Sequence, residues 1–168
     1  MNVFNKAPVY KGNAPHRISP IIAGALLLCV LLLLSSCTKP DFTDTAGQTG
    51  RFQDFQGKWL VINYWAEWCE PCREEIPEFN LFAKQHADTT EVFAISYDSL
   101  SAQELAEQAN RMGIEFRVLT QDPSVFLGFK KPQVLPATYI FKPDGSFYKE
   151  LLGPQTQESL ENLLFGSK

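Results

Sequence analysis

Apolar runs along the chain predict strands that are covered on both faces. Residues 58–65 and 91–97 are almost continuously apolar, and a shorter segment at 116–120 predicts a third strand. A run of strand length without polar alternation is typical of a strand buried on both sides. We therefore expect a central sheet that lies between two covering layers.

Helical segments alternate with these strands, and a hairpin follows them. The segments with helical spacing or helix-start signals are 69–86, 101–112, 123–129 and 156–165. The side chains expected on the buried side of the first helix are Ile76, Phe79, Leu81 and Phe82. Residues 137–141 and 146–152 flank Pro143-Asp144-Gly145 and predict a β-hairpin. This order predicts an α/β fold with a central mixed sheet flanked by helices.

The first 36 residues are predicted to be an export signal. Residues 1–40 contain no Asp or Glu, and three basic residues precede an apolar run of 14 residues at 21–34. That run is shorter than the roughly 20 residues that a membrane-spanning helix needs. A basic start before a short apolar segment is typical of a signal peptide.

Leu34-Ser35-Ser36-Cys37 ends this segment and resembles the bacterial lipobox. The resemblance implies that the signal peptide, residues 1–36, is removed and that the lipidated Cys37 becomes the new N-terminus. Thr38 stands where an Asp would indicate retention in the inner membrane, which favours the outer membrane. Two alternatives stay open, namely an uncleaved anchor helix and cleavage without a lipid.

Residues 37–51 are predicted to be the lipidated cysteine and a flexible tether. Nearly all residues between Thr38 and Gly50 are polar, Gly or Pro, which is typical of a linker. A tether of about 13 residues has a typical reach of about 20 Å. The folded domain is then expected at 52–168, a length that suits one domain.

Removal of the signal peptide changes the charge and the cysteine count. The net charge falls from −4 to −7, because three of the 15 basic residues are lost while all 19 acidic residues remain. This charge argues against a nucleic-acid partner, which requires a basic surface. Cys29 is lost and Cys37 is lipidated, so Cys69 and Cys72 are the two thiols left free in the mature sequence.

These two cysteines form the motif on which the functional interpretation rests. Trp68-Cys69-Glu70-Pro71-Cys72 lies between the first buried strand and a helix. A Cys-x-x-Cys in this context indicates a redox pair. The free N–H groups and the positive dipole end of the helix stabilise a thiolate there, and a proline in the first turn costs no hydrogen bond.

Half of a zinc site is the alternative interpretation of this motif. A structural zinc site needs four ligands, which are usually Cys and His. Of these, the mature sequence offers Cys69, Cys72 and His86. Because a carboxylate would have to complete the set, we expect no metal.

Two separated segments resemble the thioredoxin superfamily. Val61–Cys72 is similar to its active-site strand and loop, and Leu135–Phe141 is similar to its cis-proline segment. Tyr97 and Pro136 are 39 positions apart, which leaves room for an additional helix and strand. This is similar to the membrane-tethered TlpA/ResA type of thiol:disulfide oxidoreductase. The resemblance implies a thioredoxin-like fold with a TlpA-type insertion.

The resemblance also implies substrate-binding residues around the cysteines. It implies that the Leu135–Pro136 peptide bond is cis and that this loop faces the cysteines, where the Leu135 backbone can pair with an extended substrate. An ordinary proline at the start of a strand is the alternative. Trp68, which directly precedes Cys69, is expected to shield the thiol or to contact the substrate.

One departure from thioredoxin itself concerns a buried acid. Asn63 stands at the position of that acid and cannot take a proton. Glu75 follows Cys72 by three residues, so both lie on one helical face, and the ResA-type pattern also places a Glu there. A partly buried carboxyl has a raised pKa and can exchange protons with Cys72. The alternative is a solvated helix residue.

The predicted reaction is thiol–disulfide exchange with no cofactor beyond the redox-active Cys69–Cys72 pair. Cys69 attacks a substrate disulfide, and Cys72 then attacks Cys69 to release the reduced substrate. Negative charge at Glu70, Glu74 and Glu75 should raise the thiol pKa and disfavour the reduced thiolate state. This predicts a disulfide reductase in the cell envelope, acting on exported proteins.

The sequence does not name the substrate. Apocytochrome c in cytochrome c maturation, an oxidised periplasmic enzyme and general repair all fit. The resemblance implies that a membrane thiol transporter donates the electrons. We expect a monomer that is held at the periplasmic side of the membrane by its lipid. A disulfide oxidase or isomerase stays open as an alternative. A metal-binding chaperone of the Sco type, with Cys-x-x-x-Cys, fits less well.

Overall fold

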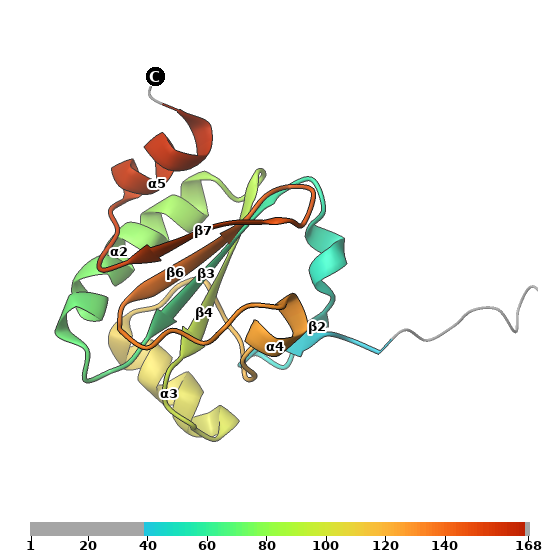
Figure 1. Cartoon of the computed structure of the whole chain (residues 1–168). Coiled ribbons are helices and arrows are strands. Elements are labelled where there is room, and N and C mark those ends of the chain that lie inside the picture. The colour runs from blue at the N-terminus through green and yellow to red at the C-terminus, as the bar shows by residue number, and fades with distance from the viewer. Residues whose placement is uncertain (1–38, 167–168) are drawn as a thin grey trace, which may run out of the picture. The chain divides into compact units, whose positions relative to one another are not determined.

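The computed structural model describes residues 39–166 (Figure 1). The predicted signal peptide, residues 1–36, and the predicted lipidation site Cys37 lie outside the described residues. From Pro40 onward the chain forms one compact unit.

A five-stranded mixed sheet forms the centre of this unit, with the strand order β5-β4-β3-β6-β7. The strands are β3 Trp59–Trp65, β4 Thr90–Ser96, β5 Arg117–Val118, β6 Ala137–Phe141 and β7 Phe147–Leu152. β3, β4 and β5 are parallel, whereas β6 and β7 are antiparallel to their neighbours. The predicted α/β architecture with a mixed sheet is therefore confirmed.

Helices cover both faces of the sheet, since the apolar side chains of β3 point alternately to one face and to the other. The helices are η1 Phe52–Phe55, α2 Glu70–Gln85, α3 Ala102–Met112, α4 Ser124–Leu127 and α5 Gln157–Phe165. Val61 packs with buried residues of α2 and α5, and Trp65 packs with those of α3. Ile62, on the other face, packs in a cluster that η1 and α4 also join. Figure 1 accordingly shows α2 and α5 on one side of the sheet and α4 with β2 on the other.

Two local predictions need correction. The third strand was expected over 116–120 but spans only Arg117–Val118, because the Thr120 N–H turns to the Thr43 carbonyl rather than to β4. Leu81 was expected on the buried side of α2 but its side chain is 54% exposed. The buried side of α2 is formed by Ile76, Phe79 and Phe82, which follow one another at intervals of three residues. Leu81 comes one residue before Phe82, so its side chain is rotated around the helix axis away from that side.

The prediction that residues 37–51 form a flexible tether is wrong from Pro40 onward. β1 Phe42–Thr43 and β2 Thr49–Gly50 pair as a short antiparallel hairpin. Both Asp41 and Asp44 hold it in place, since Asp41 N–H donates to the Gly50 carbonyl and Asp44 accepts two N–H groups in the turn. The polar composition that resembles a linker therefore belongs to an ordered turn.

A single aromatic side chain joins this hairpin to the core. Phe42 is 4% exposed, and its ring lies 5.1 Å from the ring of Phe52 and 5.2 Å from that of Phe93. Gly50 lies beneath the same ring, where an added Cβ would be 2.6 Å from the Phe42 Cζ. The folded domain thus begins about ten residues earlier than composition predicts.

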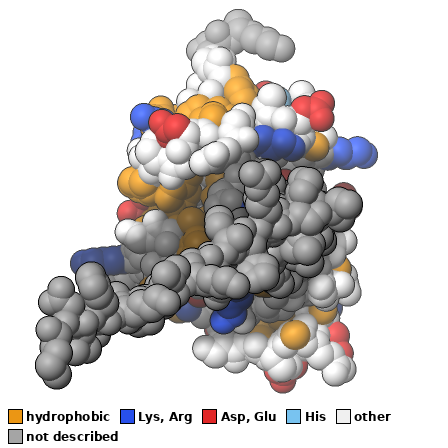
Figure 2. Space-filling model, turned by 90° about the vertical axis from the view of Figure 1, so that its right-hand side faces the viewer, with side chains coloured by type: hydrophobic (Ala, Val, Ile, Leu, Met, Phe, Trp, Pro, Cys, Tyr) orange, Lys and Arg blue, Asp and Glu red, His pale blue; other side chains and the backbone are white. Residues whose placement is uncertain are grey.

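Hydrophobic side chains also reach the surface on the side of the molecule that Figure 2 shows (orange).

We expect replacement of Phe42 by Ala to destabilise the whole domain. Removing a buried aromatic ring costs about 3 kcal/mol of unfolding free energy. Urea unfolding of the full chain measures this, with Gln48→Ala as a control because Gln48 is an exposed hairpin residue. A loss below about 1 kcal/mol for Phe42→Ala would mean that the hairpin behaves as a tether after all.

Candidate active site

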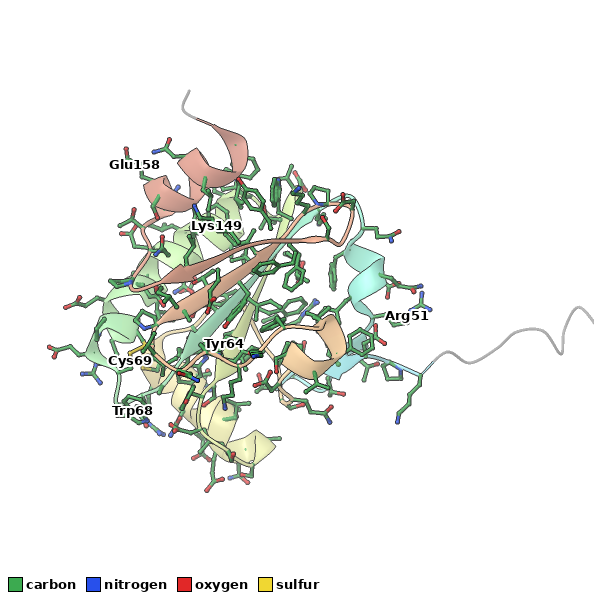
Figure 3. All side chains as sticks on the ribbon, in the orientation of Figure 1. Arg51, Tyr64, Trp68, Cys69, Lys149 and Glu158 are labelled. Atoms are coloured by element: carbon green, nitrogen blue, oxygen red, sulfur yellow. A yellow bond between two sulfur atoms is a disulfide. The ribbon has the colours of Figure 1, made fainter. Side chains whose placement is uncertain are left out.

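Cys69 and Cys72 lie where β3 leads into α2, at the carboxyl end of the parallel strands. Cys69 is the N-cap residue of α2 and Cys72 lies within its first turn. The two form a disulfide with their Cα atoms 5.3 Å apart. Cys69 is 5% exposed, whereas Cys72 is fully buried. Figure 3 shows Cys69 next to Trp68 at this end of the sheet. The predicted pairing is confirmed, and Cys69 is the more accessible sulfur.

Glu75 is buried one helical turn after Cys72, and its side chain is 1% exposed. Its Oε1 accepts a hydrogen bond of 2.7 Å from Asn63 Nδ2, and its Oε2 accepts one of 3.0 Å from the Gln155 N–H. Burial raises the pKa of Glu75 to about 7, although both hydrogen bonds act to lower it. The alternative that Glu75 is a solvated helix residue is therefore wrong.

Asn63 provides the amide that faces this carboxyl. It lies fully buried in the middle of β3, opposite Thr138 of β6. Its Nδ2 also lies 3.4 Å from Thr138 Oγ1, while its Oδ1 has no hydrogen-bond partner. Both partners of the Glu75 carboxyl are therefore donors, which stabilise its ionised form. If the Asn63 amide rotated by half a turn, its Oδ1 would take the place of Nδ2 and could accept a hydrogen bond from the protonated Glu75 carboxyl.

The predicted cis-proline loop lies against the cysteines. The Leu135–Pro136 peptide bond is cis, as the resemblance implies. Leu135 is partly buried against the same cluster that contains Cys69 and Cys72. Within residues 39–166, no hydrogen bond outside the sheet ladder uses the Leu135 N–H or carbonyl. The backbone of Leu135 is therefore available to an extended substrate, as expected.

Trp68 presents a large apolar surface next to Cys69. Its side chain is 64% exposed. The indole Nε1 donates to both carboxylate oxygens of Asp98, at 3.1 and 3.2 Å, and the ring meets that of Tyr97 edge-on at 6.5 Å. Lys131 Nζ lies 4.3 Å from the Tyr97 ring centre and donates to the Tyr97 carbonyl. Trp68 is thus held in place while its ring stays open to a substrate.

Sequence reasoning missed several residues of this site. Asp98 follows β4, so a signal existed, because the carboxyl ends of parallel strands meet at one edge of a sheet. Lys131 donates to the Tyr97 carbonyl, a contact that the sequence does not indicate. Gln155 gave no signal, since it contributes only a backbone N–H from a loop 80 positions after Glu75.

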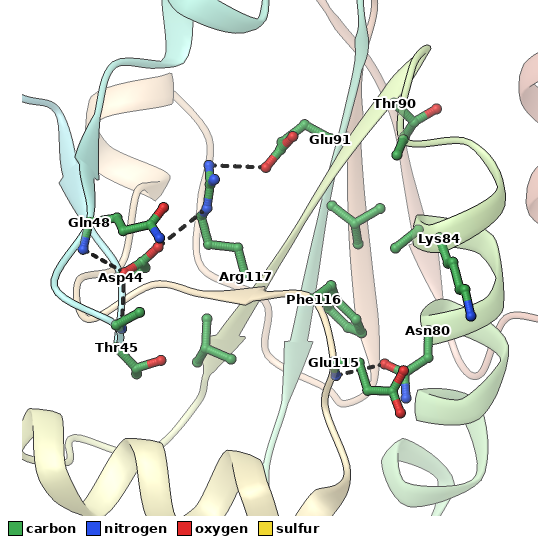
Figure 4. A pocket seen from close by; sticks show the side chains of 15 residues that line it. Asp44, Thr45, Gln48, Asn80, Lys84, Thr90, Glu91, Glu115, Phe116 and Arg117 are labelled. Atoms are coloured by element: carbon green, nitrogen blue, oxygen red, sulfur yellow. Dashed lines mark hydrogen bonds and ion pairs between the residues drawn. The ribbon is translucent and has the colours of Figure 1, made fainter.

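A pocket of about 610 Å³ lies away from the cysteines (Figure 4). α2, β4, the end of β5 and the N-terminal hairpin line it. Among its charged groups, Arg117 pairs with Asp44 at 3.3 Å and with Glu91 at 3.1 Å. Asn80 accepts from the Glu115 N–H. With these groups engaged in structural contacts and no cysteine in the lining, we do not assign chemistry to this cavity.

No group of three or more His, Cys, Asp or Glu within residues 39–166 is arranged to hold a metal ion. No helix in the same range has the length and apolar character needed to cross a membrane.

Comparisons with known proteins agree with this geometry. The AhpC/TSA family matches residues 36–148, which is 113 of the 168 residues. The thiol-disulfide oxidoreductase ResA of Bacillus thuringiensis (strain Al Hakam) is 30% identical over 128 residues, covering 74% of this chain and 73% of that protein. ResA of Geobacillus kaustophilus is 30% identical over 132 residues, covering 76% and 74%. The crystal structure of StoA from Bacillus subtilis matches with a TM-score of 0.59 at 20% identity, covering 72% and 92%, and supports the fold.

We expect Glu75→Gln to make stability less dependent on pH. The pKa of Glu75 is raised from 4.5 to about 7 in the folded protein. The contribution of this carboxyl to the unfolding free energy is therefore complete below its pKa in the unfolded chain, and it is lost as the pH rises through about 7. At about pH 8 the native protein should have lost up to about 3 kcal/mol of unfolding free energy, and the variant should not show this loss. Urea unfolding of the oxidised proteins at about pH 5 and pH 8 measures the difference. Glu74→Gln, at an exposed position, is the control. Parallel pH profiles of native protein and Glu75→Gln would contradict the assignment.

We expect Asn63→Ala to raise the pKa of Glu75 above its native value of about 7. The variant loses the amide that donates to the ionised carboxyl, and one such hydrogen bond corresponds to a pKa change of about one. Carboxyl ¹³C NMR titration of the oxidised protein reports this pKa directly. Thr138→Val is a matched control, because Thr138 touches Asn63 but not Glu75. An unchanged or lower pKa in Asn63→Ala would show that the amide does not stabilise the charge.

Proposed function

The chain belongs to the AhpC/TSA family and is a thiol-disulfide oxidoreductase, and on that premise we propose that it reduces disulfide bonds of exported proteins. The observation that carries this proposal is the buried Glu75, one turn after Cys72 in a Cys-x-x-Cys at a helix start. It supplies a proton acceptor for the second thiol of the pair, which a reductase must deprotonate in every turnover.

The reaction begins with the reduced pair. The Cys69 thiolate attacks one sulfur of the substrate disulfide, which forms a mixed disulfide and expels the other substrate sulfur as a thiolate. Cys72 then loses its proton and attacks the Cys69 sulfur. The enzyme disulfide forms, the second substrate thiolate leaves, and two electrons have passed from the enzyme to the substrate.

In this proposal Glu75 takes the proton from Cys72. With a pKa near 7, about half of the carboxyl is ionised at neutral pH, so it can accept a proton and later return it. Hydrogen bonds from Asn63 and Gln155 keep its ionised form in place. Water has little access, since Cys72 and Glu75 are both buried.

The substrate is proposed to bind across the Leu135 backbone and the Trp68 ring. Leu135 offers backbone groups that have no hydrogen-bond partner among residues 39–166, beside the cysteine cluster. Trp68 offers an exposed apolar ring next to Cys69. An extended segment could pair with the first and pack on the second, which suits unfolded or flexible exported proteins such as apocytochrome c.

The direction of electron flow follows from the charge near the thiols. Glu70 lies in the first turn of α2, between the two cysteines. Glu67 also lies close by in sequence, but Arg111 binds its carboxylate with two hydrogen bonds and holds its pKa below the usual range. The negative charge left by Glu70 opposes the thiolate that the helix end favours. This balance supports a reductant.

We further propose that the mature protein is a lipoprotein of the cell envelope. Cys37 in its lipobox-like segment would carry the lipid, and the domain would work on the periplasmic side as a monomer. Electrons would come from a membrane thiol donor, since the pair must be reduced again after every turnover. Lipid labelling at Cys37, lost in Cys37→Ser, tests the anchor.

We expect the reduction potential of the Cys69–Cys72 pair to lie near or below that of thioredoxin, about −270 mV. Equilibration of the full chain with glutathione or dithiothreitol buffers, followed by thiol trapping, measures it. A value near that of DsbA, about −120 mV, would make the protein an oxidant and support the oxidase or isomerase alternative.

The assignment of the two cysteines has a separate test. Cys72→Ser should accumulate a mixed disulfide with substrate proteins, because Cys69 can attack but nothing resolves the product. Cys69→Ser should form no such adduct and should reduce no substrate. Adducts formed by Cys69→Ser instead would reverse the two roles.

A further inference from the structure

The start of the folded domain fixes how far it can lie from a lipid at Cys37. Four residue steps separate Cys37 from Asp41, and an extended chain spans at most about 3.5 Å per step, or about 14 Å. Asp41 is held by the fold, because its N–H donates to the Gly50 carbonyl and its Oδ2 accepts from the Phe52 N–H at 3.0 Å. A lipidated Cys37 would therefore keep this side of the domain against the membrane surface.

An exposed apolar pair lies beside that point of entry. Val125 is 91% exposed and Phe126 is 60% exposed, both on α4. The Phe126 ring lies 5.6 Å from the ring of Phe52, whose N–H binds Asp41. Figure 1 shows α4 beside β2 on this side of the sheet. Exposed aromatic and aliphatic side chains are what a lipid interface can bury.

The charges around this pair do not oppose such a contact. α4 consists of Ser, Val, Phe and Leu and carries no charge. On the neighbouring η1, Asp54 pairs with Arg51 at 2.9 Å, which leaves that pair neutral overall. Asp122 lies just before α4, where its Oδ1 accepts from the Ser124 N–H and the Tyr64 O–H. Lys130 follows α4, so the sequence around the pair carries one charge of each sign and not an acidic excess that would repel anionic headgroups.

We propose that α4 docks on the lipid surface, with Val125 and Phe126 inserted among the headgroups. The inference rests on the proposed lipid anchor at Cys37, which supplies both the membrane and the short link. Cys69 belongs to the cluster on the α3 face of the sheet, whereas α4 covers the opposite face. Docking through α4 therefore leaves the cysteine pair outside the contact and open to protein partners.

Photo-crosslinking of the full-length lipoprotein in bacterial membranes tests the docking surface. A photoreactive benzoylphenylalanine replaces Phe126 in one variant and Leu81 in a matched control. Leu81 is 54% exposed but lies on α2, on the opposite side of the sheet. We expect several-fold more phospholipid adduct at position 126 than at position 81, measured by mass spectrometry. Intact mass of the same samples reports whether Cys37 carries its lipid.

These readouts separate the docking surface from the anchor. If Cys37 is lipidated but positions 126 and 81 label equally, or position 126 labels a protein or a second copy of the chain, the docking is wrong and the anchor stands. Lipid adduct at position 126 without lipidation supports the surface and overturns the anchor. Absence of both overturns both.

Discussion

A carboxyl group buried one helical turn from the cysteine pair is the constraint on which the structure depends. Glu75 is almost completely enclosed, and burying a charge costs several kcal/mol unless hydrogen bonds offset it. The fold supplies two donors from distant parts of the chain, Asn63 in the central strand and the Gln155 N–H before α5. Strand, helix and closing segment must therefore pack together before the buried carboxyl has both of its hydrogen-bond donors.

The junction between β3 and α2 explains why the cysteine pair lies at one end of the sheet. Cys69 lies after β3, at the start of α2. Asp98 follows the parallel β4 at the same edge of the sheet, where it accepts a hydrogen bond from Trp68. The antiparallel β6 begins there too, after the cis-proline. The cysteine pair, Trp68 and the cis-proline loop thus come from different elements but lie at one edge of the sheet.

How far the sequence predicts this site depends on whether a contact is local. The cysteine pair and the placement of Glu75 follow from spacing along one helix, and both are confirmed. The hairpin at residues 42–50 was missed because its stability comes from Phe42 in a distant aromatic cluster, which composition does not reveal. Gln155 was missed because a backbone N–H carries no residue signature. Leu81 was misplaced because adjacent apolar residues in a helix cannot all face one side.

The ordered hairpin changes what the protein could reach. A tether of about 13 residues would give the domain roughly 20 Å of freedom, enough to meet partners well away from the lipid. Because the fold instead begins at Pro40, a lipidated Cys37 would confine the cysteine pair to the zone next to its own membrane. Direct electron transfer from the proposed membrane donor would then require that donor to lie in the same membrane as the lipid. If the lipid is in the other membrane, as the prediction from Thr38 would have it, a soluble carrier would have to bring the electrons across. Under the proposed anchor, the length of the link would therefore limit which redox partners the cysteine pair can meet.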